Sequence, residues 1–375
     1  MSSKAAFVYD HTLSAYQIPE DHPLTPKRLR WTFELLQYYK AFDNPCSILV
    51  KPRAATEKEL LAFHTREYVE AVKAFSRGER MDAQFEYGFS DFGDNPSFPG
   101  MYEAACLSVG ATMVATELVE SGQVDVAFNI AGGLHHALSD RTSGFCIFND
   151  PVIAITHLIK KDRRVAYVDI DAHHGDGVQE GFYDDPHVLT VSMHESGRYL
   201  FPGTGFTDEI GEGKGRGYAV NLPLHPYTGD DAYLYVFREV VLPLLHAFKP
   251  DVLFTQLGVD THYNDPLTHL KLTTKAFVSV LTDFHRLDLP WVATGGGGYE
   301  PGVTARCWAL AYGVMAGRQW PDDLPPTMRE QLGASKLRDM IDPIPLDNMK
   351  EAAQRHAEQV VERIKATVFP IHRLS

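Results

Sequence analysis

The densest group of polar side chains lies at residues 169–177, which read Asp-Ile-Asp-Ala-His-His-Gly-Asp-Gly. An apolar run typical of a buried strand comes just before it. Because side chains alternate along an extended chain, Asp169, Asp171 and His173 should point to the same side. Three carboxylates and two imidazoles this close would repel and desolvate one another unless a cation neutralised them. The spacing therefore favours a metal site over the simpler alternative, a turn in which an aspartate caps the next helix.

A further aspartate, Asp260, follows a second apolar run at residues 252–258. Taken alone, it would indicate a helix cap or a turn. Together with Asp171 and His173 it completes a set of three ligands, and catalytic zinc commonly has three protein ligands and one open position. The four cysteines are far apart and form no C-x-x-C pair, so any metal site must use histidine and carboxylate.

Two adjacent histidines, His135 and His136, follow a pair of glycines after a predicted strand. The chain has 17 histidines, and most of them must be ordinary surface or core residues. Here, however, Asp169 and Asp176 could each accept a hydrogen bond from one imidazole, which would fix its tautomer and raise its basicity. Two such pairs beside a water molecule would form a general-base system.

Four consecutive glycines precede Tyr299. They belong to neither of the common phosphate-binding glycine motifs, so nucleotide binding has weak support. A tyrosine on a glycine-rich loop could donate its hydroxyl to a developing oxyanion, although Tyr299 taken alone would more simply be a packing residue.

Predicted strands and helices alternate along the chain around these residues. Short apolar runs predict strands buried on both faces of a parallel sheet, and longer patterns between them predict helices. Loops rich in glycine, proline, aspartate and asparagine should form a ligand crevice at the carboxyl ends of the strands. The sequence thus predicts an α/β fold, with one domain over residues 1–375 and a mostly parallel sheet flanked by helices on both faces. Strands are expected at 5–9, 124–129, 165–170, 188–193, 218–222, 252–258 and 291–294; helices at 102–119, 152–159, 232–248, 274–287, 303–316 and 347–368; and the loops at 81–100, 195–217 and 263–270.

Composition narrows the class of protein. The chain carries 35 lysines and arginines against 49 aspartates and glutamates, a formal net charge of −14, which argues against a nucleic-acid surface and favours a cationic or neutral substrate. No stretch approaches the roughly 20 apolar residues of a membrane helix, and the first residues lack the layout of a signal peptide. We therefore expect a cytoplasmic enzyme with no nucleic-acid or membrane partner.

Taken together and in order, these segments resemble the histone deacetylase superfamily, and within it the bacterial acetoin-utilization branch. The resemblance implies the fold shared by arginases and deacetylases and a zinc-dependent hydrolase of linear amides. Its substrate would be acetylated lysine, or a related acyl-lysine, in a protein or peptide. The matching segments are 22–30, 132–136, 143–146, 169–177, 201–205, 258–262 and 295–299.

The resemblance also implies a role for each matching residue. Zinc, or iron(II) in the cell, would be held by Asp171, His173 and Asp260. His136, backed by Asp176, would take a proton from the attacking water and later deliver one to the leaving amine. His135, backed by Asp169, would be its electrostatic partner, and Tyr299 would stabilise the oxyanion.

Further residues would contact the substrate or a second ion. The lysine methylenes would pass through a narrow tunnel lined by Gly144, Phe145, Phe201 and Leu267. Asp94 would bind the substrate backbone at the rim, and Arg28 would lie near an internal cavity for acetate release. A structural potassium ion would be held by side chains of Asp169, Asp171 and Ser192 and by main-chain oxygens of His173 and Met193.

Three alternative functions differ in the residues that they require. A binuclear ureohydrolase of the arginase type would need carboxylates where Gly175 and His262 stand, so the sequence argues against it. An acetylpolyamine amidohydrolase would share the catalytic set, and the negative chain would attract polyamines as well as lysine-rich peptides. A non-catalytic protein that binds an acyl ligand or a partner should have lost at least one catalytic group, and none is missing. The natural substrate and the oligomeric state stay open.

Overall fold

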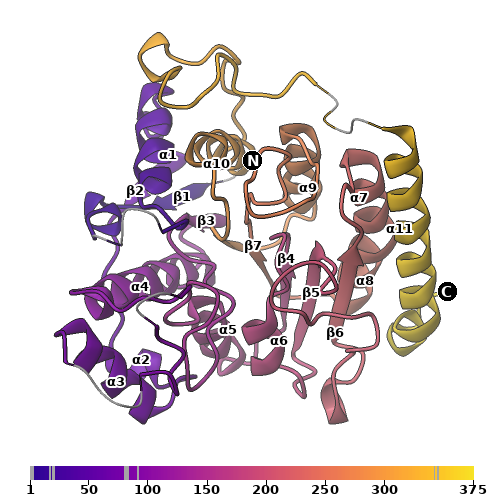
Figure 1. Ribbon diagram of the computed structural model, residues 1–375, viewed down its shortest axis with the longest axis horizontal. Helices are drawn as coiled ribbons and strands as arrows, with labels where there is room; N and C mark the ends of the chain where they lie inside the picture. The colour runs from indigo at the N-terminus through magenta and orange to yellow at the C-terminus, as the bar shows by residue number, and fades with distance from the viewer. Residues whose placement is uncertain are drawn as a thin grey trace.

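A computed structural model describes residues 4–16, 18, 22–79, 84–90, 93–341, 343 and 346–375. The strands within this part are β1 Ala5–Val8, β2 Ser47–Val50, β3 Val126–Asn129, β4 Val165–Asp169, β5 Val188–Glu195, β6 Ala219–Leu224, β7 Val252–Gln256 and β8 Trp291–Thr294. They form one sheet in the order β2-β1-β3-β8-β7-β4-β5-β6, and every pairing between them is parallel (Figure 1). The predicted parallel α/β architecture is confirmed.

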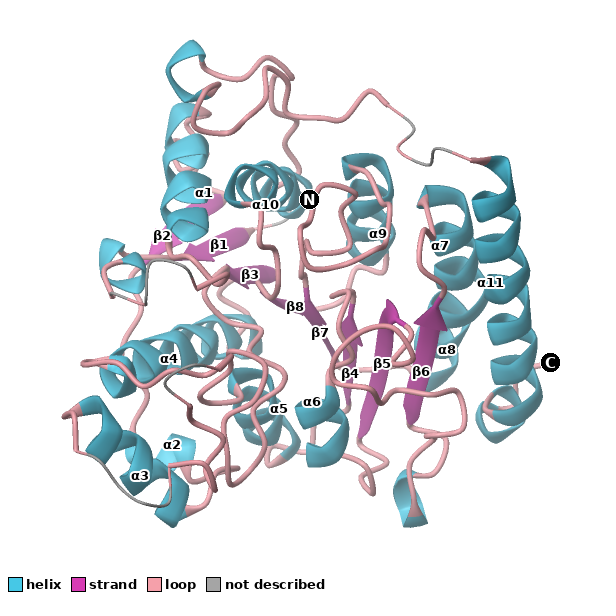
Figure 2. Ribbon diagram, viewed as in Figure 1, coloured by secondary structure: helices cyan, strands magenta, loops and turns pink. Residues whose placement is uncertain are grey.

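Helices cover both faces of this sheet (Figure 2). They are α1 Lys27–Tyr38, α2 Glu57–Leu60, α3 Arg66–Ser76, α4 Met101–Glu120, α5 Asp150–Ile159, α6 Asp176–Gly181, α7 Asp230–Val236, α8 Leu242–Phe248, α9 Thr274–Arg286, α10 Pro301–Met315 and α11 Asp347–Thr367. In the view of Figure 1, α1, α10, α9 and α7 lie above the sheet and α4, α5 and α6 below it, while α11 runs along the edge strand β6. In the described part of the chain, no helix is both long and apolar enough to cross a membrane.

The seven predicted strands are all present, with ends that differ by up to two residues. The edge strand β2 was not predicted, because its four residues range from the buried Ser47 to the exposed Leu49 and carry little periodic signal. The predicted helix at 232–248 is interrupted by a π-helical turn, Phe237–Val241. Helices α1, α2, α3 and α6 were not predicted. Part of the predicted loop at 81–100 lies outside the described residues.

Strand register explains why distant segments can meet. The last residues of four adjacent central strands pair in one row, Asn129 with Thr294, Thr294 with Gln256, and Gln256 with Asp169. Because all four strands are parallel, the chain leaves each of them at the same edge of the sheet. The ends of these strands and the segments that follow them carry all the candidate catalytic residues, which places them where open α/β sheets bind ligands.

Candidate active site

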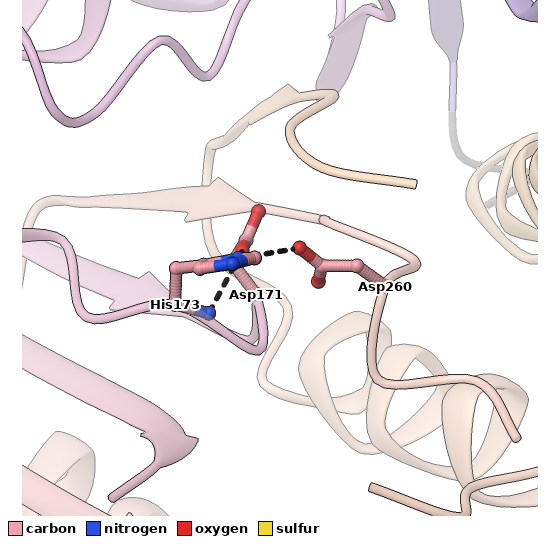
Figure 3. Close-up of side chains that lie close together, drawn as sticks. All are labelled: Asp171, His173 and Asp260. Carbon is pink, nitrogen blue, oxygen red and sulfur yellow. Dashed lines mark hydrogen bonds and ion pairs between the residues drawn. The ribbon is translucent and has the colours of Figure 1, made fainter. Parts of the chain in front are cut away.

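Asp171, His173 and Asp260 converge just beyond the ends of β4 and β7 (Figure 3). All three are buried, and one potential ligand atom from each lies within 4.8 Å of the others. The Nδ1 atom of His173 is 2.8 Å from Asp260 Oδ2 and 3.1 Å from Asp171 Oδ1. The predicted set of ligands is thus brought together.

The protein orients both carboxylates through their other oxygens. Asp171 Oδ2 accepts hydrogen bonds from Gln256 Nε2 at 2.6 Å and from the main-chain N–H of Gly297 at 2.7 Å. Asp260 Oδ1 accepts one from the N–H of Ala172 at 2.7 Å. Each carboxylate therefore keeps one oxygen facing the imidazole of His173. Such outer contacts hold metal ligands in orientation.

The chemistry of these donors fits a divalent cation. Burial lowers the pKa of His173, but the carboxylates of Asp171 and Asp260 outweigh it and raise the pKa to about 10. The site therefore favours a positive charge at this point. Two carboxylate oxygens and one imidazole nitrogen are the ligand types that suit zinc or iron(II).

The two adjacent histidines each contact a carboxylate. His135 Nδ1 is 2.6 Å from Asp169 Oδ2, and His136 Nδ1 is 2.6 Å from Asp176 Oδ1. The Nε2 atoms of the two imidazoles lie 3.1 Å apart. The ring of His136 is 5.9 Å from that of His173, so both His–Asp pairs border the candidate metal site.

The two imidazoles differ in charge. Burial lowers the pKa of His135, but Asp169 and Asp171 outweigh it and raise the pKa to about 9. Burial and the neighbouring charge of His135 lower the pKa of His136. At neutral pH this arrangement favours a protonated His135 and a neutral His136, which can accept a proton.

Tyr299 stands beside the metal site at the end of the glycine-rich loop. Its ring lies 6.2 Å from that of His173, and its main-chain N–H donates to Asp265 Oδ2 at 2.8 Å. Burial and the charges of Asp260 and Asp171 raise the pKa of Tyr299 well above its usual value. The hydroxyl therefore stays protonated and can donate a hydrogen bond.

Two of the predicted tunnel residues lie beside Tyr299 and His136. The ring of Phe145 is 5.7 Å from that of Tyr299, and the ring of Phe201 is 5.0 Å from that of His136. Gly144 has a φ of +50°, and a Cβ there would lie 2.4 Å from Cδ2 of His136, so only glycine fits. Phe201 is 43% exposed and Leu267 is 36% exposed, as expected of residues near an opening.

The predicted rim residue, Asp94, is exposed, and contacts through its neighbours connect it to Phe145. His22 Nε2 is 3.1 Å from the carbonyl oxygen of Asp94, and the ring of His22 packs against Phe145 at 4.8 Å. The neighbouring Asn95 accepts a hydrogen bond from the N–H of Phe145. The contacts thus join the rim to Phe145, while a substrate contact at Asp94 stays a prediction.

Arg28 is buried and holds the glycine-rich loop. Its guanidinium donates to the carbonyl of Gly296 and stacks over the ring of Trp308 at 5.0 Å. It also lines a small pocket of about 60 Å³ together with Tyr16, Phe145 and Ile147. The internal cavity and its use for acetate release stay predictions.

The potassium site stays a prediction. Asp169 Oδ2 accepts a hydrogen bond from the hydroxyl of Tyr167, and Ser192 Oγ lies 2.8 Å from Nδ1 of His194. Ser192 pairs with Asp169 in the sheet, which places their side chains near one another.

Sequence reasoning missed Gln256 and Asp265, which orient Asp171 and the main chain of Tyr299. Gln256 is the strongly polar last residue of the largely apolar strand β7, a signal that could have identified it. Asp265 lies in a polar loop, where nothing in the local pattern marks it.

Comparisons with known proteins agree with this geometry. Residues 22–315 match the family described as "Histone deacetylase domain". The chain is 40% identical over 378 residues to "Acetoin utilization protein AcuC" of Bacillus subtilis (strain 168), covering 96% of this chain and 97% of that protein. It is 37% identical over 327 residues to "Histone deacetylase 1" of Homo sapiens, covering 86% of this chain and 66% of that protein.

Solved structures give the same result. A crystal structure of an HDAC homolog complexed with SAHA aligns with a TM-score of 0.88 at 32% identity, covering 97% of this chain and 100% of that one. An HDAC homolog from Aquifex aeolicus aligns with a TM-score of 0.86 at 33% identity, covering 96% and 100%. With the fold, the converging site residues and these relatives in agreement, the chain belongs to the histone deacetylase family and is a hydrolase of the deacetylase type.

Proposed function

We propose that this protein hydrolyses the amide bond of Nε-acetyl-lysine, or of a related acyl-lysine, in proteins, releasing acetate and free lysine. The observation that carries the proposal is the convergence of Asp171, His173 and Asp260 beside two buried histidine–carboxylate pairs. One catalytic domain over residues 1–375 and a cytoplasmic location belong to the same proposal.

Asp171, His173 and Asp260 would hold Zn²⁺, or Fe²⁺ in the cell. When bound, the metal supplies Lewis acidity that activates water and polarises the substrate carbonyl. His136 is the general base: its Nε2 takes the proton of the attacking water while Asp176 holds Nδ1. The same imidazole then delivers a proton to the leaving amine.

His135 and Tyr299 stabilise the charges that develop. The protonated His135, held by Asp169, lies 3.1 Å from His136 and offers a fixed positive charge beside the reaction. The hydroxyl of Tyr299 donates to the oxyanion as the carbonyl is attacked. Donors that are already oriented need no reorganisation during the reaction.

The aromatic surroundings favour an acylated lysine over a free one. Acetylation removes the lysine charge, so the side chain can lie between Phe145 and Phe201 without the large cost of desolvating an ammonium ion. A structural potassium ion near Asp169 and Ser192 is a further part of this proposal.

An acetylpolyamine is the second candidate substrate. The net charge of −14 favours any cationic substrate, and the same catalytic groups would serve. A role limited to binding an acyl ligand is disfavoured, since every catalytic group of the proposed mechanism is present and oriented.

A side-by-side assay tests these choices. Acetyl-lysine peptides, longer acyl-lysine peptides and acetylated polyamines are compared before chelation, after chelation, and after adding back Zn²⁺ or Fe²⁺. We expect acetyl-lysine peptides to be hydrolysed fastest, with activity lost on chelation and restored by metal. Asp260→Asn should abolish the metal-dependent rate, whereas Asp288→Asn, at an exposed site, should not. Equal rates after complete metal removal would overturn the mechanism, and faster turnover of polyamines would favour the second candidate.

A further inference from the structure

The segment 133–137, which carries His135 and His136, is irregular and largely buried. Buried main-chain N–H and C=O groups outside helices and sheets need other hydrogen-bond partners. Here four of these groups are bound by two consecutive side chains at the start of α5, Asn149 and Asp150.

Asp150 binds the first half of the segment. Its Oδ2 accepts a hydrogen bond from the N–H of Gly133 at 3.0 Å, and its Oδ1 accepts one from the N–H of Leu134 at 2.8 Å. The hydroxyl of Thr112 in α4 also donates to Oδ2. Asp150 is fully buried and makes no ion pair with any residue that the structure describes.

Asn149 binds the second half. Its Nδ2 donates to the carbonyl oxygens of His135 at 3.2 Å and Ala137 at 2.9 Å, while its Oδ1 accepts from the N–H of Val152 as the cap of α5. Asn149 is itself held, because its main-chain N–H donates to His64 Nε2 at 2.9 Å.

The chemistry of the two side chains cannot be exchanged. An ionised carboxylate only accepts, which matches the two N–H groups, and an amide nitrogen donates, which matches the two carbonyls. The main chain here also packs tightly against its neighbours. A Cβ at Gly132 would lie 2.4 Å from Asp150 Oδ2, and one at Gly133 would lie 2.5 Å from the carbonyl oxygen of Gly295.

A buried carboxylate without a cationic partner costs folding free energy, so its presence calls for another role. We propose that Asn149 and Asp150 are positioning residues that fix the main chain of residues 133–137 and thereby hold His135 and His136 against the metal site. Neither side chain is among the residues assigned to the substrate or to the metal. This inference rests on the proposed function, because that function assigns the reaction to the two histidines.

The test is the pair of charge-pattern variants Asp150→Asn and Asn149→Asp, assayed with the zinc-loaded protein and an acetyl-lysine peptide. In Asp150→Asn an amide nitrogen, a donor, replaces one carboxylate oxygen and faces a main-chain N–H. In Asn149→Asp a carboxylate oxygen, an acceptor, replaces the amide nitrogen and faces main-chain carbonyl oxygens. We expect kcat to fall by roughly 10- to 100-fold, because a displacement of the histidines of about 1 Å has that effect. KM should change by less than about two-fold, since no group that binds substrate is lost. Zinc stoichiometry should be unchanged.

The matched control is Asp140→Asn, which makes the same change at an exposed carboxylate shortly after the histidine pair. It should keep the wild-type kcat. If Asp150→Asn does not fold, Thr112→Val removes the hydroxyl that donates to Asp150 Oδ2 and accepts from Asn129 Nδ2, and it should lower kcat by roughly three-fold with KM unchanged. A wild-type kcat in the folded variants, or a loss confined to KM or to zinc content, would overturn the proposal.

Hydrogen exchange separates this inference from the proposed function. Amide protons of residues 133 and 134 should exchange faster in Asp150→Asn than in wild type and in Asp140→Asn, whatever substrate the enzyme takes. Unchanged exchange would count against the positioning role. If the zinc-loaded wild-type protein hydrolysed no acylated amine, the proposed function would instead be wrong.

Discussion

At the scale of single residues, the two adjacent histidines show how position sets charge. Two imidazolium ions whose Nε2 atoms lie 3.1 Å apart would repel one another strongly, so one proton is favoured and two are not. The proton belongs on His135, whose partner Asp169 is fully buried, whereas the side chain of Asp176 is 20% exposed. This difference in burial between the two carboxylates leaves His136 as a neutral base beside a charged His135 at the same pH.

Tyr299 leads to the first prediction. Tyr299→Phe removes only the hydroxyl and should lower kcat by roughly two to three orders of magnitude if that hydroxyl stabilises the oxyanion. Bound zinc should be unaffected, since Tyr299 is not among the three candidate ligands. The measurement is steady-state kinetics with zinc analysis of the same samples, and Tyr38→Phe, at an exposed position, is the control. A variant with near-wild-type kcat would remove Tyr299 from the mechanism.

At the scale of elements, buried contacts between loops support the site. His64, between α2 and α3, lies next to the start of α5: its Nε2 accepts from the N–H of Asn149, and its Nδ1 is 3.3 Å from the carbonyl oxygen of Ser139. These contacts require a neutral imidazole with the proton on Nδ1. Burial lowers the pKa of His64 to about 4.

His64 therefore predicts a loss of stability in acid. A histidine in an unfolded chain has a pKa near 6.5. Below that pH the unfolded chain therefore binds a proton at His64, whereas the folded protein does not. The stabilising contribution is complete above about pH 6.5 and is lost as the pH falls towards 4. Between pH 7.5 and pH 5 it should cost roughly 2 kcal/mol.

Denaturant unfolding of wild type and His64→Gln at both pH values measures this loss. The variant, which has no imidazole at this position, should lose about 2 kcal/mol less than wild type over that interval. His246→Gln, at an exposed site, serves as the control. Identical losses for all three proteins would show that His64 is not kept neutral by folding.

At the scale of the whole molecule, the charge of −14 should act on cationic substrates before they bind. We expect kcat/KM for a lysine-rich acetylated peptide to fall several-fold between roughly 0.05 M and 0.5 M salt, because ions screen the long-range attraction. A net-neutral acetylated peptide should show little change. Steady-state assays of both peptides over this range of salt concentration measure kcat/KM. An equal salt dependence of kcat/KM for the two peptides would exclude steering by net charge.

Much of the fold and of the site followed from local pattern. Seven of the strands were predicted, because a buried parallel strand is a short continuous apolar run that can be recognised without knowing its neighbours. The cluster at 169–177 was visible because Asp169, Asp171 and His173 alternate along one extended segment. Strand β2 has only the three-residue apolar run Ile48, Leu49 and Val50, which is too short to predict a strand by itself.

Local sequence pattern indicated the kinds of chemistry available: a histidine pair, carboxylates after strands, no cysteine site and a tyrosine after glycines. Which of these residues meet depends on the three-dimensional arrangement of the strands. Asp260 contacts His173 although 87 positions separate them in the sequence, and Asn149 and Asp150 bind the main chain of the histidine segment. Strand order and register, which long-range packing sets, bring the ends of β3, β8, β7 and β4 into one row, and no local periodicity encodes that order.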